Sequence, residues 1–170
     1  MDNRNQPERS ENPSTLTRDT LLDILAEMPD GGEMPLKVTG TSMTPFLLDR
    51  RSVVYLKKDV SYVPKRGDIV FFTRPSGGFV LHRVWKLRED GLLVINGDAQ
   101  TWTELTRPED ILAHVTHFVR RKRDISVENR FYRLLVSLWM PLRPLHAFLA
   151  RLVIYWHLLP KKLFPKRRER

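Results

Sequence analysis

The 170-residue chain has no cysteine and no uninterrupted apolar run of membrane-spanning length. The first absence excludes disulfide frameworks, thiolate zinc sites and a cysteine nucleophile, so any protein nucleophile must be a hydroxyl or an amine. The second argues against a transmembrane helix, which needs about 18 or more consecutive apolar residues. The polar opening, MDNRNQPERSENPS, also lacks the apolar core of a secretory signal. We therefore expect residues 1–15 to be a disordered leader in a cytoplasmic protein.

Positive charge is concentrated towards the C-terminus. Residues 1–117 carry 15 Lys and Arg against 17 Asp and Glu, whereas residues 118–170 carry 14 against 3. The net charge is therefore −2 for the body and +11 for the tail. Such a tail favours contact with an anionic surface, either a membrane or a nucleic acid, and the simpler alternative is a solvated run of charge.

Short β-rich segments dominate the middle of the chain. Segments such as SVVYLKK, DIVFFTR and GLLVING are separated by turn signals such as RPSGG and REDG. This pattern is typical of an all-β domain, and it predicts a coiled, barrel-like antiparallel sheet over about residues 36–119. Leucines at helical spacing predict a short amphipathic helix over about residues 17–28. Residues 16–120 are thus expected to form one β domain with an N-terminal helix.

Residues 121–170 are expected to form a helical, basic region. Its apolar runs are interrupted by arginines and prolines, which favours two kinked amphipathic helices. Lying on an anionic bilayer, these helices would place Trp139, Tyr155 and Trp156 near headgroup depth and the terminal basic cluster on phosphates. This predicts a peripheral membrane protein. The alternative is that the helices pack on the sheet or on a second copy of the chain, as in a homodimer.

Ser42, in the stretch TGTSMTPFL, is the candidate nucleophile. A serine at a turn is ordinarily structural, and a nucleophilic serine needs a general base within hydrogen-bond reach. His82, in FVLHRVWKL, is the candidate base, because strand alternation places it on one face with Val80 and Val84 and so desolvates its imidazole. With an ordinary pKa near 6.5, a histidine base is mostly neutral at pH 7.

Four ordered segments, GTSMTP, KRGDIVFF, LHRV and NGDA, resemble the successive conserved boxes of type I signal peptidases and their relatives. The match is to the subgroup with a histidine base, found in endoplasmic-reticulum and archaeal-type enzymes, and it covers about residues 36–119. The resemblance implies a mainly β fold of the signal-peptidase and LexA type. It also implies a serine endopeptidase that cleaves an extended peptide or leader, with Ser42 as nucleophile, His82 as base and no cofactor.

The resemblance leaves two candidates for the carboxylate that orients His82. Enzymes of the histidine type place an aspartate six positions beyond the Asp of the GD box, and here that position is Glu104. Asp98, the Asp of the box itself, is the other candidate.

The oxyanion site also departs from the family pattern. Some bacterial relatives supply a serine hydroxyl two residues before the nucleophile, and here that position is Gly40. The developing charge would then rest on backbone N–H groups, that of Ser42 first, with help from the hydroxyl of Thr41. Met43, which follows the nucleophile, is expected to be part of the same oxyanion and substrate-binding turn.

Two other functions compete with this interpretation. A LexA-like processing or self-cleaving peptidase would use a lysine base, and no DNA-binding motif is evident, so no nucleic-acid partner is expected. A weak or inactive barrel that only binds peptides or membranes is favoured if the departures at Glu104 and Gly40 disable catalysis. His114 and His117 lack cysteine or acidic partners at ligand spacing, so no metal site is expected.

Overall fold

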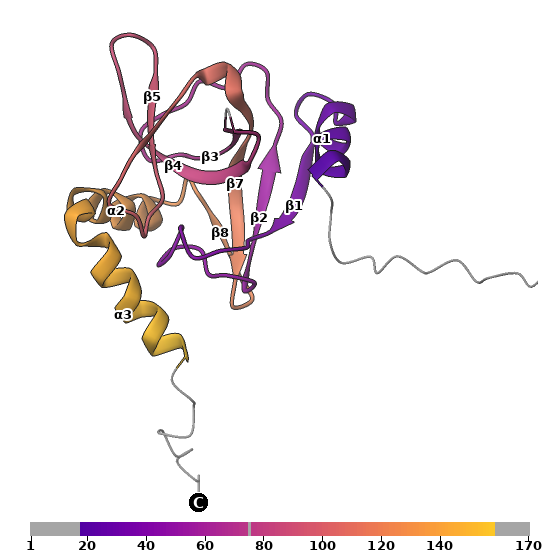
Figure 1. Cartoon of the computed structure of the whole chain (residues 1–170). Helices are drawn as coiled ribbons and strands as arrows, with labels where there is room; N and C mark the ends of the chain where they lie inside the picture. Colours follow the sequence, from indigo (N-terminus) through magenta and orange to yellow (C-terminus); the bar gives the residue numbers. More distant parts are fainter. Residues whose placement is uncertain (1–17, 75, 159–170) are drawn as a thin grey trace, which may run out of the picture.

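The protein, described over residues 18–74 and 76–158 of a computed structural model, is mainly β (Figure 1). One antiparallel sheet of eight strands has the order β1-β2-β7-β3-β4-β5-β6, and β8 pairs with β7. The strands are β1 (Glu33–Lys37), β2 (Ser52–Lys57), β3 (Ile69–Thr73), β4 (Phe79–Leu87), β5 (Leu93–Asn96), β6 (Glu104–Thr106), β7 (Ile111–Arg120) and β8 (Arg123–Ser126). The helices are α1 (Arg18–Glu27), α2 (Arg130–Trp139) and α3 (His146–Leu158), with 3-10 turns η1 (Pro108–Asp110) and η2 (Met140–Leu145). The antiparallel, mainly β prediction is confirmed.

The sheet does not close. Among the described strands, β1 and β6 are the two ends of the order, so the expected barrel-like closure is not formed. The long strand β7 joins the two halves, because it pairs with β2 along most of its length, with β3 at its beginning and with β8 at its end. A bulge between Tyr55 and Leu56 interrupts the β2–β7 register, and such a bulge bends and twists a strand.

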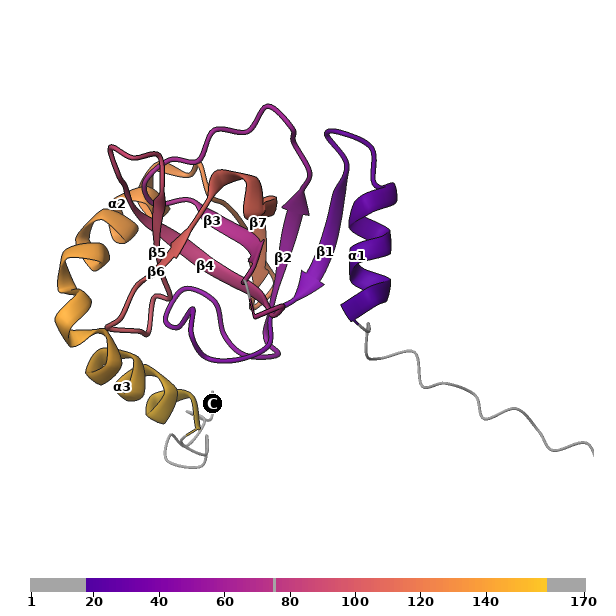
Figure 2. The ribbon, with the colours of Figure 1, turned by 45° about the horizontal axis from the view of Figure 1, so that its top comes forward.

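The helix α1 lies beside β1, at the opposite end of the molecule from α2 (Figure 2). Its Leu21 and Leu25 are buried in the main hydrophobic cluster. The ammonium of Lys58 donates to the carbonyl groups of Leu25, Ala26 and Met28 at 2.9, 3.0 and 2.9 Å. Because the last carbonyls of a helix have no partner within the helix, this lysine both completes α1 and fixes it to the sheet. The expected leader lies outside the described residues.

The predicted domain boundary at residue 120 falls inside a β hairpin. Strand β8 continues the hairpin to Ser126, and Tyr132 and Val136 of α2 belong to the main hydrophobic cluster. Asn129 starts α2, because its side-chain oxygen accepts hydrogen bonds from two backbone N–H groups of the first turn. Basic composition does not reveal that α2 has a buried face, so residues 121–140 belong structurally with the β domain.

Candidate active site

A cavity of about 620 Å³ opens between α1, the chain that leaves β1 and the beginning of β4. Its walls are mainly apolar side chains from all three elements. The polar residues that line it are Lys37, Thr39, Ser42, Arg74, His82 and Gln100. Ser42 and His82, forty residues apart in the chain, therefore border one cavity, and within the described residues no hydrogen bond joins them.

The turn that carries Ser42 is held from two sides. On one side, Gly40 has φ +89° and its N–H donates to Oδ1 of Asp49 at 2.8 Å. On the other side, the carbonyl oxygen of Ser42 accepts a hydrogen bond of 2.7 Å from the N–H of Ala99. A Cβ atom added at Gly97 would lie 2.9 Å from that carbonyl oxygen, so glycine at position 97 permits the close approach.

The groups expected to bind the oxyanion lie on this turn. The backbone N–H groups of Ser42 and Met43 donate to no acceptor among the described residues, so both remain able to donate to a bound group. Met43 is buried and lines the cavity, whereas Thr41 is exposed and is not among the lining residues. The turn therefore has two backbone N–H groups able to donate, and the apolar side chain of Met43, beside the Ser42 hydroxyl.

Strand β4 places His82 as the alternation of its sequence predicts. Val80 and Val84 lie in a second hydrophobic cluster, whereas Leu81 and Trp85 pack against the main cluster on the other side of the sheet. The side chain of His82 is 3% exposed and shares the face of the two valines. The desolvated imidazole expected from the sequence is thus present.

Glu104, the first residue of β6, is the carboxylate beside His82. Its Oε1 lies 3.3 Å from Nδ1 of His82, an ion-pair distance without the alignment of a hydrogen bond. Arg74, which directly follows β3, donates from Nε and Nη2 to the two oxygens of Glu104, at 2.5 Å each. Because Nδ1 faces the carboxylate, Nε2 is the ring nitrogen left for a proton from Ser42.

Burial and charge set the protonation of this group. Desolvation lowers the pKa of His82 to about 4, the charge of Glu104 opposes the shift, and the charge of Arg74 adds to it. Hydrogen bonds from Arg74 lower the pKa of Glu104. At neutral pH the site therefore holds a neutral imidazole beside a carboxylate anion.

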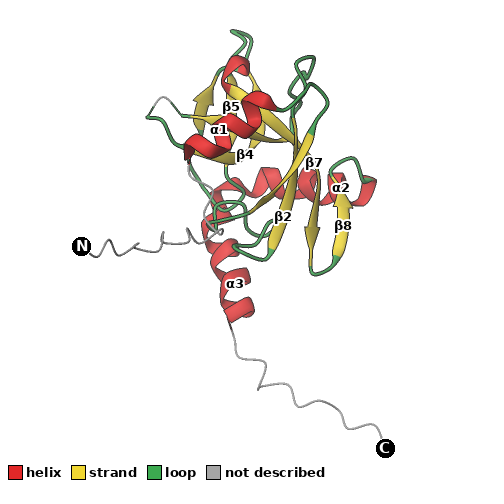
Figure 3. Cartoon of the chain, turned by 90° about the vertical axis from the view of Figure 1, so that its right-hand side faces the viewer, coloured by secondary structure: helices red, strands yellow, loops and turns green. Residues whose placement is uncertain are grey.

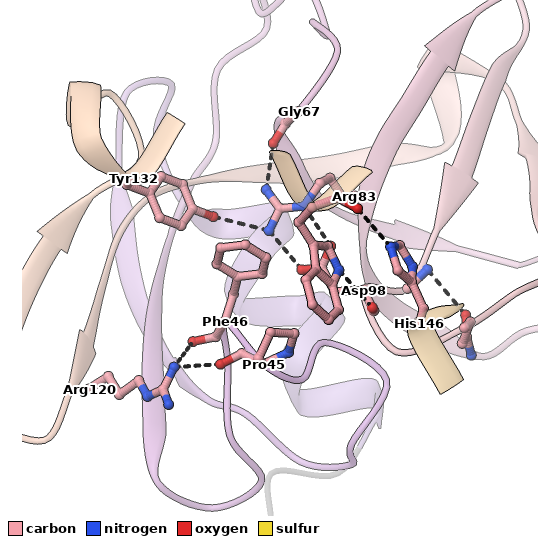
Figure 4. Close-up of polar contacts among 11 residues, drawn as sticks. Pro45, Phe46, Gly67, Arg83, Asp98, Arg120, Tyr132 and His146 are labelled. Atoms are coloured by element: carbon pink, nitrogen blue, oxygen red, sulfur yellow. Dashed lines mark hydrogen bonds and ion pairs between the residues drawn. The ribbon is translucent and has the colours of Figure 1, made fainter. Parts of the chain in front are cut away.

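Asp98, the other candidate for orienting His82, is paired elsewhere (Figure 4). Its two oxygens accept from Nε and Nη2 of Arg83 at 2.8 and 2.7 Å, and both side chains are buried. Arg83 also donates to the hydroxyl of Tyr132 at 3.1 Å and to the carbonyl of Gly67 at 2.6 Å. Asp98 thus belongs to a buried network that joins β4 to α2, on the face of β4 opposite His82.

Arg74 and the Arg83–Asp98 pair were not predicted from the sequence. Arg74 stands next to a glycine-rich turn, where a basic residue is ordinarily a solvated charge. Only the tertiary structure brings it to Glu104 of β6, because β4 and β5 lie between β3 and β6 in the sheet order. The sequence did indicate that Arg83 is buried, because strand alternation places its side chain on the face of β4 opposite His82, and that face is packed.

Comparison of the chain with family models, with curated proteins and with solved structures finds no match. Among residues 18–74 and 76–158, no three His, Cys, Asp or Glu side chains are grouped as ligands for a metal ion. In the same described ranges, no helix has the length and apolar character needed to cross a membrane.

Proposed function

We propose that this protein is a serine endopeptidase of the signal-peptidase type. The observation that carries the proposal is that Ser42 and His82 border one cavity, with the carboxylate of Glu104 behind the imidazole. A hydroxyl, a neutral base and an anion that stabilises the protonated base are the three groups that serine peptidases combine on unrelated folds.

In the proposed reaction the Ser42 hydroxyl attacks the scissile carbonyl while Nε2 of His82 takes its proton. In this proposal the oxyanion is held by the N–H groups of Ser42 and Met43, which donate to no acceptor among the described residues. The leaving amine then takes the proton from His82 as the C–N bond breaks, which gives an acyl-serine ester. A water molecule attacks the ester, His82 takes its proton and returns it to Ser42, and the carboxylic acid is released. Glu104 stabilises the imidazolium in both halves.

The substrate is proposed to bind as an extended peptide strand. Among the described strands, β1 pairs with β2 alone, and residues 80–82 of β4 pair with β3 but not with β5, whose pairing begins at Arg83. One edge of β1 and the edge of β4 at residues 80–82 are therefore paired with no described strand, and both segments contribute to the cavity wall. A free edge lets a peptide add as a new strand, and the apolar wall would receive alternate side chains of the peptide.

A peptide-binding domain without cleavage is the second candidate. It is favoured by the two hydrogen bonds from Arg74, which draw negative charge of Glu104 away from His82. His82, with a pKa near 4, is also a weak proton acceptor. If substrate binding does not raise the pKa of His82, the cavity would bind peptides without cleaving them.

A peptide-library assay separates the two functions. The full chain, Ser42→Ala and the control Ser61→Ala, which alters an exposed turn serine, are each incubated with extended peptides, and both cleavage products and bound peptide are measured. Cleavage by the wild type and the control but not by Ser42→Ala supports the peptidase. Equal cleavage by Ser42→Ala contradicts it, and equal peptide binding by all three without cleavage supports the binding domain.

A further inference from the structure

Helix α2 has two apolar stripes, and the fold covers one of them. Tyr132 and Val136 face the sheet and are about 5% exposed. Phe131, Leu134 and Leu138 recur at the three- and four-residue spacing of a second stripe and are 69%, 55% and 62% exposed. A helix that packs on a core by one stripe ordinarily carries polar residues elsewhere on its surface, so this second stripe needs another partner.

A second group of exposed apolar residues follows α2 in the chain. Leu145, Phe148, Leu152 and Tyr155, at the end of η2 and along α3, are 52%, 62%, 42% and 62% exposed. Their spacing of three, four and three residues keeps them on one side of a helix. Figure 3 shows α3 extending away from the sheet, so the sheet does not cover its outer part. We call these exposed apolar residues of α2, η2 and α3 the outer stripe.

The charge around the outer stripe is of one sign. Residues 130–158 contain no Asp or Glu, and the side chains of Arg130 and Arg151 are exposed. By sequence, residues 159–170 then add six Lys and Arg against one Glu. With four arginines in residues 130–158, the whole of residues 130–170 has ten basic residues against one acidic residue, a net charge of +9.

We propose that the outer stripe docks on an anionic lipid membrane. Its apolar side chains would lie among the acyl chains, and the neighbouring arginines Arg130 and Arg151 would lie at the phosphates. A membrane of this kind supplies both an apolar layer and negative charge, which is the combination that the stripe and its surroundings match. This inference does not depend on the peptidase proposal, because none of the outer-stripe residues lines the cavity.

Two other partners fit less well. A symmetric dimer through this face would bring the same patch of both copies together, and so place two segments of net charge +9 against each other. A nucleic acid would satisfy the basic residues but would leave most of the exposed leucine side chains in contact with water or phosphate.

Docking would fix the orientation of the whole β domain. The covered stripe of α2 belongs to the main cluster, and Tyr132 also accepts a hydrogen bond from the buried Arg83. Deleting residues 129–170 would therefore remove part of the core as well as the docking face, so point substitutions in the full chain are the sharper test.

The test is sedimentation of the full chain with vesicles at low salt. Vesicles of phosphatidylcholine mixed with phosphatidylglycerol are compared with vesicles of phosphatidylcholine alone. The apolar variant is Phe131→Ser with Leu138→Ser, and its matched control is Val60→Ser with Val63→Ser, at two exposed valines of the body, 81% and 68% exposed. The charge variant is Arg130→Gln with Arg151→Gln.

We expect the wild type and the valine control to sediment with the anionic vesicles and much less with the neutral ones. The apolar variant should lose at least about tenfold in partition coefficient. Each arginine removed should cost about fivefold, and added salt should shrink that difference.

Three results would overturn the proposal. One is wild-type protein that stays in the supernatant with anionic vesicles. Another is an apolar variant that binds vesicles as well as the valine control does. The third, measured by light scattering without lipid, is a wild-type dimer that Phe131→Ser with Leu138→Ser converts to a monomer while vesicle binding is absent, which would assign the face to self-association.

Discussion

Oε1 of Glu104 lies 3.3 Å from Nδ1 of His82, although the two residues are 22 positions apart in the chain and the whole of β5 lies between them. Asp98 is nearer in sequence, yet both of its oxygens are bound by Arg83. Glu104 is therefore the carboxylate that the geometry favours for orienting the proposed base, and the two acids should respond differently to substitution.

Glu104→Gln is expected to lower kcat by at least about 100-fold while leaving thermal unfolding close to that of the wild type. Asp98→Asn should instead destabilise the fold, by about 3 kcal/mol or more, because it weakens the partner of the buried Arg83 cation. Denaturant unfolding and turnover are measured on both variants. A stable Asp98→Asn protein without activity, beside a fully active Glu104→Gln protein, would reverse the assignment.

Ser42→Ala and His82→Gln are each expected to reduce cleavage to the same residual rate, and the double variant should be no slower. Groups that act as one unit lose their effect together, so the second loss adds nothing. Glutamine is chosen because the imidazole is buried and alanine would leave a cavity. Wild-type turnover in His82→Gln would show that another group is the base.

The acid limb of kcat/KM should lie well below the ordinary histidine pKa of 6.5, near 4, because only the neutral imidazole accepts a proton. Arg74→Gln removes a cation that disfavours the imidazolium, so it should move the limb to higher pH. The rate is measured from acid to neutral pH for both proteins. An acid limb that stays at the wild-type position in Arg74→Gln would contradict the proposed influence of Arg74.

Folding stability should fall as the pH drops from about 6.5 to about 4. In this window the unfolded chain protonates at His82 while the native imidazole stays neutral, so the native state binds fewer protons and loses about 1.4 kcal/mol per pKa unit of difference. Above pH 6.5 both states are neutral and the full stability is present. His114, whose pKa is lowered mainly by burial, adds to the same trend. Chemical unfolding at several pH values should show a shallower fall for His82→Gln than for the wild type.

Gly97→Ala should reduce activity more than it reduces stability. The added Cβ would meet the Ser42 carbonyl oxygen at 2.9 Å and the Gln100 side-chain oxygen at 2.6 Å, so the turn that carries the nucleophile must shift. Overpacking of this kind costs about 1–3 kcal/mol. Gly78→Ala is the matched control, because a Cβ there meets nothing within 4 Å. Equal activity in the two variants would show that the approach of residue 97 does not position Ser42.

The sequence by itself determined the local features of this protein. Alternation along β4 placed His82 with Val80 and Val84, and leucine spacing predicted a helix that includes Leu21 and Leu25. These features depend on the periodicity of apolar side chains, and that periodicity can be read from the sequence alone.

Only the tertiary structure decided which distant side chains meet. In the folded chain Ser42 and His82 border one cavity, Asp98 is paired with Arg83, and Arg74 is paired with Glu104. All three outcomes follow from strand order and register. It also left the sheet open and divided α2 into a covered and an exposed apolar stripe. The physical reason is that pairing between strands far apart in the chain depends on how the whole core packs, and no local pattern of residues encodes it.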